Sequence, residues 1–302
     1  MIRIENLSKT YTLKGKQKVI ALKNLNLDVE KGEIIGLLGT NGAGKTTTLK
    51  LLTTLLYPSS GTAYIDGMDI RKDTKRIRKR IGVVFGGKMI YHRITGRDNL
   101  KFYGRIYNVR NLDKAIDELV EFFNLTDRID TLVETYSTGM KAKLALMRGL
   151  IHNPPIILLD EPTLGLDPGT SVRLRKRIRQ LKDMGKTIFL CTHYLHEAEE
   201  LCDRIAIIHK GEMVSIDTPQ RLREKIIGTG SVGVVFSRPE DAERLKAEFD
   251  MELKGQEAFV TPKNGDTLNT TLQKILALNL PIKHIHTAEP TLEDVFLELT
   301  KK

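Results

Sequence analysis

The sequence predicts a soluble α/β protein whose sheet is largely parallel. Short β-rich runs alternate with segments of helical periodicity along most of the chain, and this alternation is typical of that class. The 302 residues exceed one average domain, and 40% hydrophobic with 28% charged residues is ordinary for a folded chain. No apolar run approaches the roughly 18–20 residues of a membrane-spanning helix. At any membrane, we therefore expect a partner to hold the chain there.

The first elements combine antiparallel strands with the start of the parallel sheet. Residues 1–11 and 21–29 have alternating strand character on either side of a polar loop at 14–18. The apolar run 33–38 predicts a buried strand, and a Gly-rich turn leads from it into a helix at about 44–56. Further strands are expected at 62–65, 81–85, 156–160, 187–191 and 204–209.

A helical insertion and a second domain complete the predicted fold. Between about residues 95 and 150 no good strand appears, while 112–123 and 140–150 have helical periodicity. Gly228-Thr-Gly-Ser predicts a linker, so we expect one domain at 1–227 and a small α+β domain at 228–302. The strands and helices expected in the second domain alternate at 232–236, 240–249, 258–261, 268–278, 282–288 and 291–299.

The charge of the chain is divided unevenly between these domains. Residues 1–227 hold 39 Lys and Arg against 26 Asp and Glu, a net +13, whereas residues 228–302 hold 9 against 12, a net −3. This asymmetry supports two units with different surroundings. A basic body could bind nucleic acid or an anionic membrane leaflet, and it is equally consistent with a well-solvated surface.

The two cysteines bear on redox chemistry and metals. Cys191 and Cys202 lack the CxxC spacing of a zinc site, and both lie in apolar-periodic surroundings. We expect two reduced, buried cysteines, as in a cytoplasmic protein.

A Gly-rich turn after the strand at 33–38 carries the strongest chemical signal. Its sequence fits the phosphate-binding pattern G-x-x-x-x-G-K-[ST], between a strand and a helix as that pattern requires. Glycines let successive N–H groups face a polyphosphate, Lys45 reaches the β- and γ-phosphates, and the Thr46 hydroxyl can hold Mg²⁺. The nucleotide-binding residues expected here are Gly39, Thr40, Asn41, Gly42, Ala43, Gly44, Lys45, Thr46 and Thr47.

The strand at 156–160 ends in two acids. Ligand-binding residues lie at the carboxyl ends of parallel strands, so Asp160 can hold Mg²⁺ while Glu161 polarises the attacking water. An apolar strand that merely ends at the surface gives the same pattern, but the phosphate loop favours the catalytic interpretation.

Two further features have both structural and functional interpretations. Ser137-Thr-Gly139 opens the helix expected at 140–150, where N–H groups could meet an anion or where Ser137 or Thr138 could simply cap the helix. His193 follows the strand at 187–191, and by itself it is as consistent with a structural role as with a catalytic one.

Taken in order, these features resemble the ATP-binding cassette family over about residues 1–227. The resemblance rests on the phosphate loop, the signature-like 136–140, the strand at 156–161, Leu164-Gly-Leu-Asp167 and His193. It implies a P-loop ATPase cassette that forms a head-to-tail pair around two ATP molecules. It also implies that Ser137 and Gly139 contact the γ-phosphate bound by the other subunit, that Asp167 links the two sites, and that His193 senses the γ-phosphate beside Glu161. Tyr11 stands where the family keeps an aromatic residue that stacks on adenine, although a surface strand residue is the alternative.

The end of the chain narrows the resemblance. Residues 288–299 look like the ending of cassettes that serve small two-component exporters of drugs, sodium, lipids or polysaccharides. The expected partners are transmembrane permease subunits on separate chains and a second cassette, identical or a paralogue. The expected location is the cytoplasmic face of the membrane. Basic runs at 71–80 and 173–179 are interpreted as solvated helix faces, with lipid headgroups or a permease loop as the alternative.

The sequence departs from the family pattern at two places. The family usually has Gln after the strand at 81–85, where this chain has Gly86 and Gly87, which bears on magnesium coordination and on coupling to the permease. Thr138 and Met140 replace the commoner Gly and Gln of the signature, while Ser137 and Gly139 remain.

Two other function classes share features with this sequence. A soluble cassette ATPase acting on nucleic acid or the ribosome is compatible with the basic charge. The resemblance argues against this class, because translation-factor cassettes come in tandem on one chain and DNA-repair cassettes carry a long coiled coil. This sequence has neither a second phosphate loop nor sustained heptads. A P-loop kinase would not need Ser137-Thr-Gly139 or the long helical insertion. The exporter ATPase is therefore favoured, and no nucleic acid is expected as a partner.

Overall fold

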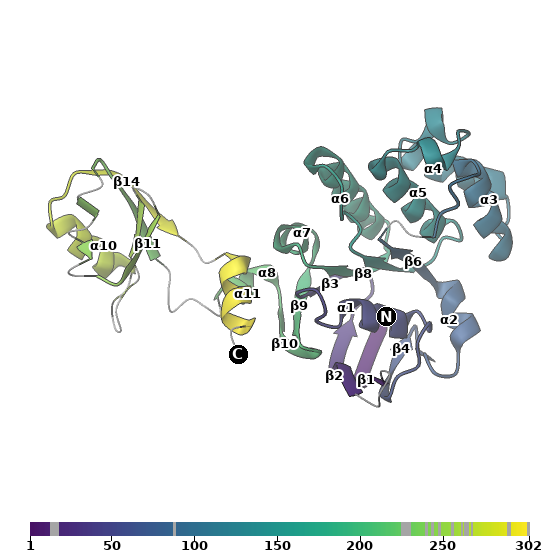
Figure 1. The fold of residues 1–302 in the computed structure, drawn as a ribbon, viewed down its shortest axis with the longest axis horizontal. Coiled ribbons are helices and arrows are strands. Elements are labelled where there is room, and N and C mark those ends of the chain that lie inside the picture. The colour runs from purple at the N-terminus through teal and green to yellow at the C-terminus, as the bar shows by residue number, and fades with distance from the viewer. Residues whose placement is uncertain are drawn as a thin grey trace. The chain divides into compact units, whose positions relative to one another are not determined.

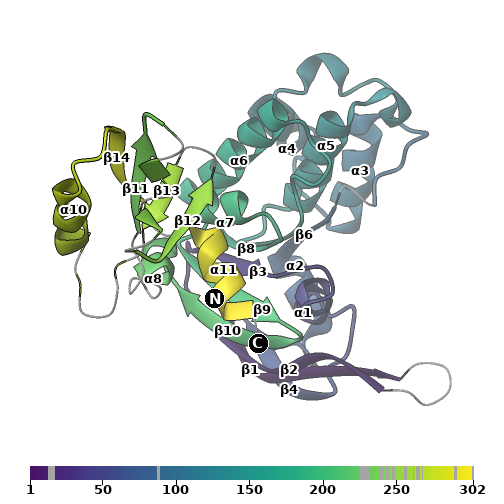
Figure 2. The same ribbon diagram turned by 60° about the vertical axis from the view of Figure 1, so that its left-hand side comes forward.

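The computed structural model divides the chain into two compact units, Met1–Thr218 and Pro219–Lys302 (Figures 1 and 2). The boundary expected between residues 227 and 228 lies outside the described residues, as do residues 228–230 of the linker expected at 228–231. The structure describes residues 1–12, 18–86, 89–224, 231–238, 241–242, 245–246, 249–254, 257–260, 262, 266, 268–288 and 291–300. None of the helices in these ranges is long and apolar enough to cross a membrane.

Unit 1 begins with an antiparallel sheet. Its strands are β1 (Ile2–Thr12), β2 (Lys18–Val29), β4 (Ser60–Ile65) and β5 (Met68–Asp69), in the order β2-β1-β4-β5. Alternate residues of β1, such as Ile2 and Ile4, are buried while their neighbours are not, as expected for a sheet with one covered face. This is the N-terminal antiparallel part that the sequence predicts.

The second sheet of unit 1 has the order β10-β9-β3-β8-β7-β6. Its strands are β3 (Ile34–Leu38), β6 (Ile81–Phe85), β7 (Ile156–Asp160), β8 (Thr187–Thr192), β9 (Arg204–His209) and β10 (Glu212–Asp217). All neighbours pair in parallel except β9 and β10. The strands β3, β7 and β8 are buried throughout, because a parallel sheet is covered on both faces. The mostly parallel sheet is confirmed; the edge strand β10 was not predicted.

Helix α1 lies between the two sheets and joins them into one core (Figure 1). Its Leu49, Leu51 and Leu52 are fully buried in a cluster with apolar residues from β1, β2, β3, β7 and β8. The helices of unit 1 are α1 (Lys45–Leu52), α2 (Thr74–Arg80), α3 (Gly96–Ile106), α4 (Leu112–Phe122), α5 (Thr138–Leu150), α6 (Pro168–Asp183) and α7 (Leu195–Leu201). The helical insertion expected at 95–150 corresponds to α3, α4 and α5.

Unit 2 is a small α+β fold with an antiparallel sheet of order β12-β13-β11-β14. Its elements are α8 (Pro219–Glu224), β11 (Ser231–Phe236), β12 (Met251–Lys254), β13 (Glu257–Val260), α10 (Leu268–Ala277), β14 (Ile282–Ala288) and α11 (Leu292–Thr300). Val234, Phe236 and Ile275 are buried in its core. The strand β12 was not predicted, and most of the helix expected at 240–249 lies outside the described residues.

Candidate functional site

The phosphate loop joins β3 to α1, and its glycines are required by its backbone. Gly42 and Gly44 have φ angles of 82° and 113°, a region that residues with a Cβ atom rarely occupy. At Gly39, a Cβ atom would lie 2.5 Å from the carbonyl oxygen of Ile208 in β9. The backbone path of this loop is therefore available only to the glycine pattern seen in the sequence.

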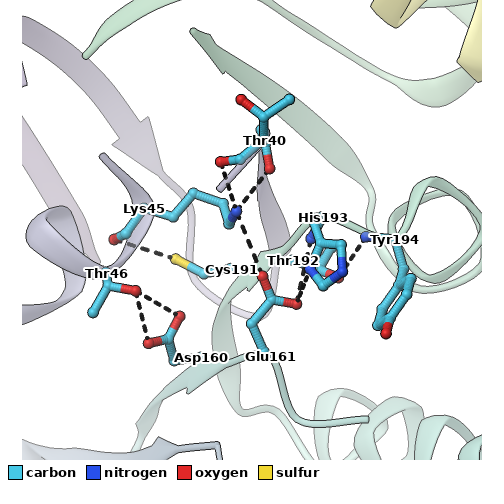
Figure 3. A network of polar contacts seen from close by, with 10 residues as sticks. Thr40, Lys45, Thr46, Asp160, Glu161, Cys191, Thr192, His193 and Tyr194 are labelled. Carbon is cyan, nitrogen blue, oxygen red and sulfur yellow. Dashed lines mark hydrogen bonds and ion pairs between the residues drawn. The ribbon is translucent and has the colours of Figure 1, made fainter. Parts of the chain in front are cut away.

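The loop delivers positive charge and N–H groups to one place. Lys45 is the first residue of α1, and its buried ammonium donates hydrogen bonds to the carbonyls of Gly39 (2.7 Å) and Thr40 (3.1 Å) (Figure 3). Gly44 caps the helix without any side-chain hydrogen bond, and the first turn holds no acid. Its N–H groups and its positive end are thus available to an anion. Thr40, Asn41 and Gly42 are exposed at this end.

Two oxygen donors from different elements meet beside the loop. The Thr46 hydroxyl donates to the Asp160 carboxylate at the end of β7, at 3.1 Å to Oδ2 and 3.4 Å to Oδ1 (Figure 3). Burial raises the pKa of Asp160, because the ionised carboxylate has lost much of its hydration. A nearby divalent cation would offset that cost. A hydroxyl with a carboxylate suits Mg²⁺, which binds few protein oxygens and keeps several waters, so the residues fit this ion.

Glu161 adopts an unusual backbone conformation directly after Asp160. Its φ is +49°, a left-handed conformation that costs a residue with a Cβ atom about 1–2 kcal/mol. Its N–H donates to the carbonyl of Cys191 in β8 (2.9 Å), which helps to hold the chain in this turn. The strained turn brings its carboxylate toward Lys45 and His193.

The Glu161 carboxylate lies between two nitrogen groups. Its Oε1 is 3.5 Å from the Lys45 ammonium, and its Oε2 is 2.8 Å from His193 Nδ1 (Figure 3). The carboxylate only accepts hydrogen bonds, so Nδ1 carries the proton in this contact. The backbone N–H of His193 approaches the same Oε2 at 3.4 Å. The structure thus brings together five predicted residues: Lys45, Thr46, Asp160, Glu161 and His193.

Three residues that the sequence did not point to support this network. The ring of Tyr194 lies 4.1 Å from that of His193, and the Tyr194 N–H donates to the Thr192 hydroxyl (3.0 Å). The Cys191 thiol lies 3.7 Å from the Lys45 carbonyl, beneath the start of α1. Burial raises the pKa of this thiol well above its usual value, which keeps it protonated. Cys191 and Cys202 are free and buried, as expected.

Ser137, Gly139 and Asp167 lie outside this network, at the starts of two neighbouring helices. Ser137 caps α5 by accepting from the Met140 N–H (3.2 Å), and Asp167 caps α6 by accepting from the Thr170 N–H (2.9 Å). Hydrogen bonding from the Thr170 side chain, and then from its N–H, lowers the pKa of Asp167. The two helix starts adjoin, because a Cβ atom at Gly139 would come 2.6 Å from Thr170 Cγ2.

Tyr11, Thr47 and Gly86 complete the predicted set. Tyr11 is half-buried near the end of β1. The neighbouring strand β2 contains Ala21, whose carbonyl lies beside Gly44 of the phosphate loop. Thr47 is half-buried in α1. Gly86 has a φ of +43° and donates its N–H to the Asp160 carbonyl (3.0 Å), so the turn after β6 adjoins the end of β7. Gly87 lies outside the described residues.

A buried carboxyl that sequence reasoning missed connects the segment after Glu161 to helix α7. Glu197 is only 1% exposed, and its Oε1 accepts from the Thr163 hydroxyl (2.8 Å). Burial raises the pKa of Glu197. No sequence pattern could have found this pair, since the two residues are far apart along the chain.

Comparison with known proteins agrees with this geometry. The family model described as "ABC transporter" matches residues 22–164. The ABC transporter ATP-binding protein NatA of Bacillus subtilis (strain 168) is 42% identical over 71% of this chain and 88% of its own length. The linearmycin resistance ATP-binding protein LnrL of the same organism is 31% identical over 99% of this chain and 98% of its own length.

An exporter component and a solved cassette extend the comparison. Nod factor export ATP-binding protein I of Rhizobium etli is 33% identical over 99% of this chain and 93% of its own length. A dimeric, post-hydrolysis structure of an ATP-binding cassette bound to ADP and Pi superposes with a TM-score of 0.67, at 29% identity, over 72% of this chain and 98% of that one. The chain therefore belongs to the ABC transporter family, as an ATP-binding subunit that hydrolyses ATP.

Proposed function

We propose that this chain drives an exporter by binding and hydrolysing ATP at the site around Lys45, at the cytoplasmic face of the membrane. The observation that carries the proposal is the position of the Glu161 carboxylate, which lies 3.5 Å from the phosphate-loop lysine. Glu161 also directly follows Asp160, the residue that accepts from Thr46. Relatives named for Nod factor export and linearmycin resistance match almost the whole chain, which supports export. Nothing among them supports an action on nucleic acid.

In this proposal the N-terminus of α1 and Lys45 bind the phosphates of ATP. Thr46 and Asp160 would hold Mg²⁺, which supplies charge neutralisation on the β- and γ-phosphates when bound. A phosphate that binds the Lys45 ammonium competes with Glu161, whose Oε1 lies 3.5 Å from it. Glu161 is thereby freed to accept a proton from the attacking water, while His193 orients the carboxylate through Nδ1.

The second cassette is proposed to face Ser137, Gly139 and Asp167. These residues stand at the starts of α5 and α6, two helix N-termini that adjoin at Gly139 and Thr170. Exposed N–H groups at such positions favour an anion. In a head-to-tail pair, this surface would meet the γ-phosphate that the other subunit binds.

A groove of about 200 Å³ between β6, α3 and α5 is the proposed contact for the permease. Phe85 and Tyr107 line it, and the backbone turn at Gly86 begins at its edge. Large apolar side chains stand exposed on the adjoining segment, including Met89 (57% exposed), Phe102 (43%) and Ile106 (58%). Exposed apolar patches of this kind mark contacts with other proteins.

Phosphate release from ATP tests the catalytic part. The purified chain should release phosphate only with Mg²⁺, and Lys45→Ala should lower ATP affinity at least tenfold, because it removes the only ammonium at the phosphate loop among the described residues. Undiminished turnover of Lys45→Ala would contradict the site.

Co-purification tests the export part. Membrane proteins encoded beside this chain should be retained by the tagged chain after detergent extraction, and Phe102→Ser with Ile106→Ser should lose them. Met184→Ser removes an equally exposed apolar side chain from α6's end and should retain them. Equal retention by both variants would exclude the exposed apolar segment beside the groove as the docking surface.

A further inference from the structure

A small pocket between α5 and α6 is lined by four cationic side chains. The pocket has a volume of about 200 Å³ and opens where Lys143 of α5 faces Arg173, Lys176 and Arg177 of α6. Its floor is apolar, formed by the buried Phe123 and Leu174. The two helices lie side by side (Figures 1 and 2).

Every hydrogen-bond acceptor that these cations meet is neutral. Arg173 donates to the Thr170 hydroxyl (2.8 Å), and Lys143 approaches the Asn124 carbonyl (3.4 Å). Arg177 donates to the side-chain oxygens of Gln180 (2.8 Å) and Asn124 (3.3 Å), and it lies 5.0 Å from the centre of the Phe122 ring. Within the described part of the chain, no carboxylate lies within 4.0 Å of any of the four.

Two of the three other basic residues of α6 pair with carboxylates. Arg175 pairs with Glu200 at 2.5 Å, and Lys182 pairs with Asp203 at 2.5 Å. The third, Arg179, is exposed, has no carboxylate within 4.0 Å among the described residues, and does not line the pocket. Three of the four unpaired cations of α6 therefore lie at the pocket. A merely solvated basic helix would have no reason to concentrate its unpaired charges around a recess.

The charges in the pocket repel one another. Burial lowers the pKa of Lys143, and the positive charges of Arg173 and Arg177 lower it further. Asp167 is close enough for Arg173 to lower its pKa, but its carboxylate is engaged with Thr170 at the start of α6. An anion in the pocket would relieve the repulsion and accept hydrogen bonds from several of the four side chains at once.

We propose that this pocket binds a small soluble polyanion that carries phosphate groups. Four cations around one recess match three or four negative charges, as on a pyrophosphate group, better than the single charge of most lipid headgroups. The recess is also too small for a nucleic-acid backbone to follow. This site is separate from the phosphate loop, because none of its residues belongs to the network around Lys45.

Occupancy of the pocket would act on the surface proposed to meet the second cassette. Lys143 lies one helical turn beyond Gly139 in α5, and Arg173 lies one turn beyond Thr170 in α6. A polyanion that bridges Lys143 and Arg173 would hold the starts of the two helices together. The ligand would therefore regulate the association of the two cassettes and would not be a substrate for hydrolysis.

Calorimetric titration with inorganic pyrophosphate tests the site. The Lys45→Ala chain, without Mg²⁺, should bind one pyrophosphate, and adding Lys143→Gln with Arg173→Gln should weaken that binding at least tenfold. The matched control adds Lys75→Gln with Lys79→Gln, which removes two exposed cations from α2, and should leave binding unchanged. In the chain that retains Lys45, the stoichiometry should fall from two to one in the pocket variant.

Each other result overturns the proposal. Equal binding by the pocket and control variants would assign the anion to general surface charge. Binding that appears only with vesicles of phosphatidylglycerol, and not with pyrophosphate, would replace the soluble polyanion by a lipid surface. Should the double variant fail to fold, Lys176→Gln removes one exposed pocket cation alone, and unweakened binding by that variant would count against the site equally.

Discussion

Replacing Glu161 by Gln separates ATP binding from ATP hydrolysis at this site. Gln has the size and shape of Glu and occupies the same left-handed backbone position at similar cost, but it cannot accept a proton from water. Loss of a positioned general base lowers turnover by about 10²- to 10⁴-fold, or about 2.7–5.5 kcal/mol of activation free energy. We expect kcat of Glu161→Gln to fall within that range.

The structure also predicts the direction of the change in ATP affinity. The carboxylate lies 3.5 Å from the Lys45 ammonium, so it competes with the phosphate for the same cation. A hydrogen bond to a charged group contributes about 1.5–3 kcal/mol, which sets the upper limit of what the competition can cost. ATP should therefore bind Glu161→Gln as tightly as the parent chain, or more tightly by at most about 100-fold.

Single-turnover phosphate release and equilibrium binding of ATP measure the two effects separately. Light scattering should in addition detect a dimer that persists with ATP in Glu161→Gln. Glu121→Gln, which removes an exposed carboxylate from α4, is the matched control and should behave as the parent chain does. Turnover of Glu161→Gln near the parent rate would refute the assignment of the base, and tenfold weaker ATP binding would refute the competition with Lys45.

Four other changes test the rest of the structure. Gly86→Gln supplies the missing side-chain oxygen, and it should raise basal phosphate release although its φ of +43° costs Gln about 1 kcal/mol of stability. Gly139→Ala places a Cβ 2.6 Å from Thr170 Cγ2, so ATP-dependent dimerisation measured by light scattering should weaken while monomer affinity for ATP stays within about threefold. Glu197 has a raised pKa in the folded chain and a pKa near 4.5 in the unfolded chain, so the stability that protonated Glu197 contributes is lost as pH rises through the folded pKa. Glu197→Gln should therefore reduce the dependence of unfolding free energy on pH, measured by urea unfolding at pH 5 to 8. A chain that ends at Thr218 should keep its ATP affinity, since every residue of the network around Lys45 lies in Met1–Thr218, and a large loss in a folded truncation would contradict this.

The sequence predicts the site well wherever its determinants are local. The phosphate loop needs glycine at particular turns, and Gly42 and Gly44 do occupy left-handed positions. The carboxyl ends of parallel strands share one edge, so Asp160 and His193 could be expected near the loop before any contact was known. The parallel sheet, the helical insertion and the α+β fold of the second unit could also be predicted, because the periodicity of hydrophobic residues is a local feature of the sequence.

The remaining features depend on contacts between distant segments. Thr163 and Glu197 come into contact because β7 and β8, the strands that precede them, are neighbours in the sheet. No sequence pattern predicts this pair. The strands β10 and β12 were missed because an exposed edge strand and a four-residue strand carry little hydrophobic pattern. The basic run at 173–179 was visible in the sequence. Only the fold shows that Arg175 pairs with Glu200 and that Lys143 faces the cations of the pocket.

The segment 161–167 connects the chemistry of one site to the surface proposed to meet the other. It begins at Glu161, whose strained backbone is held by Cys191, and ends at Asp167, which caps α6. Between them, Thr163 donates to the buried Glu197 of α7, the helix that follows His193. A displacement of the start of α6 would therefore act on Glu161 from one side and on the helix behind His193 from the other. Because both partners of the Glu161–His193 contact are tied to this one segment, we expect the position of the proposed catalytic carboxylate to depend on Asp167 and its helix.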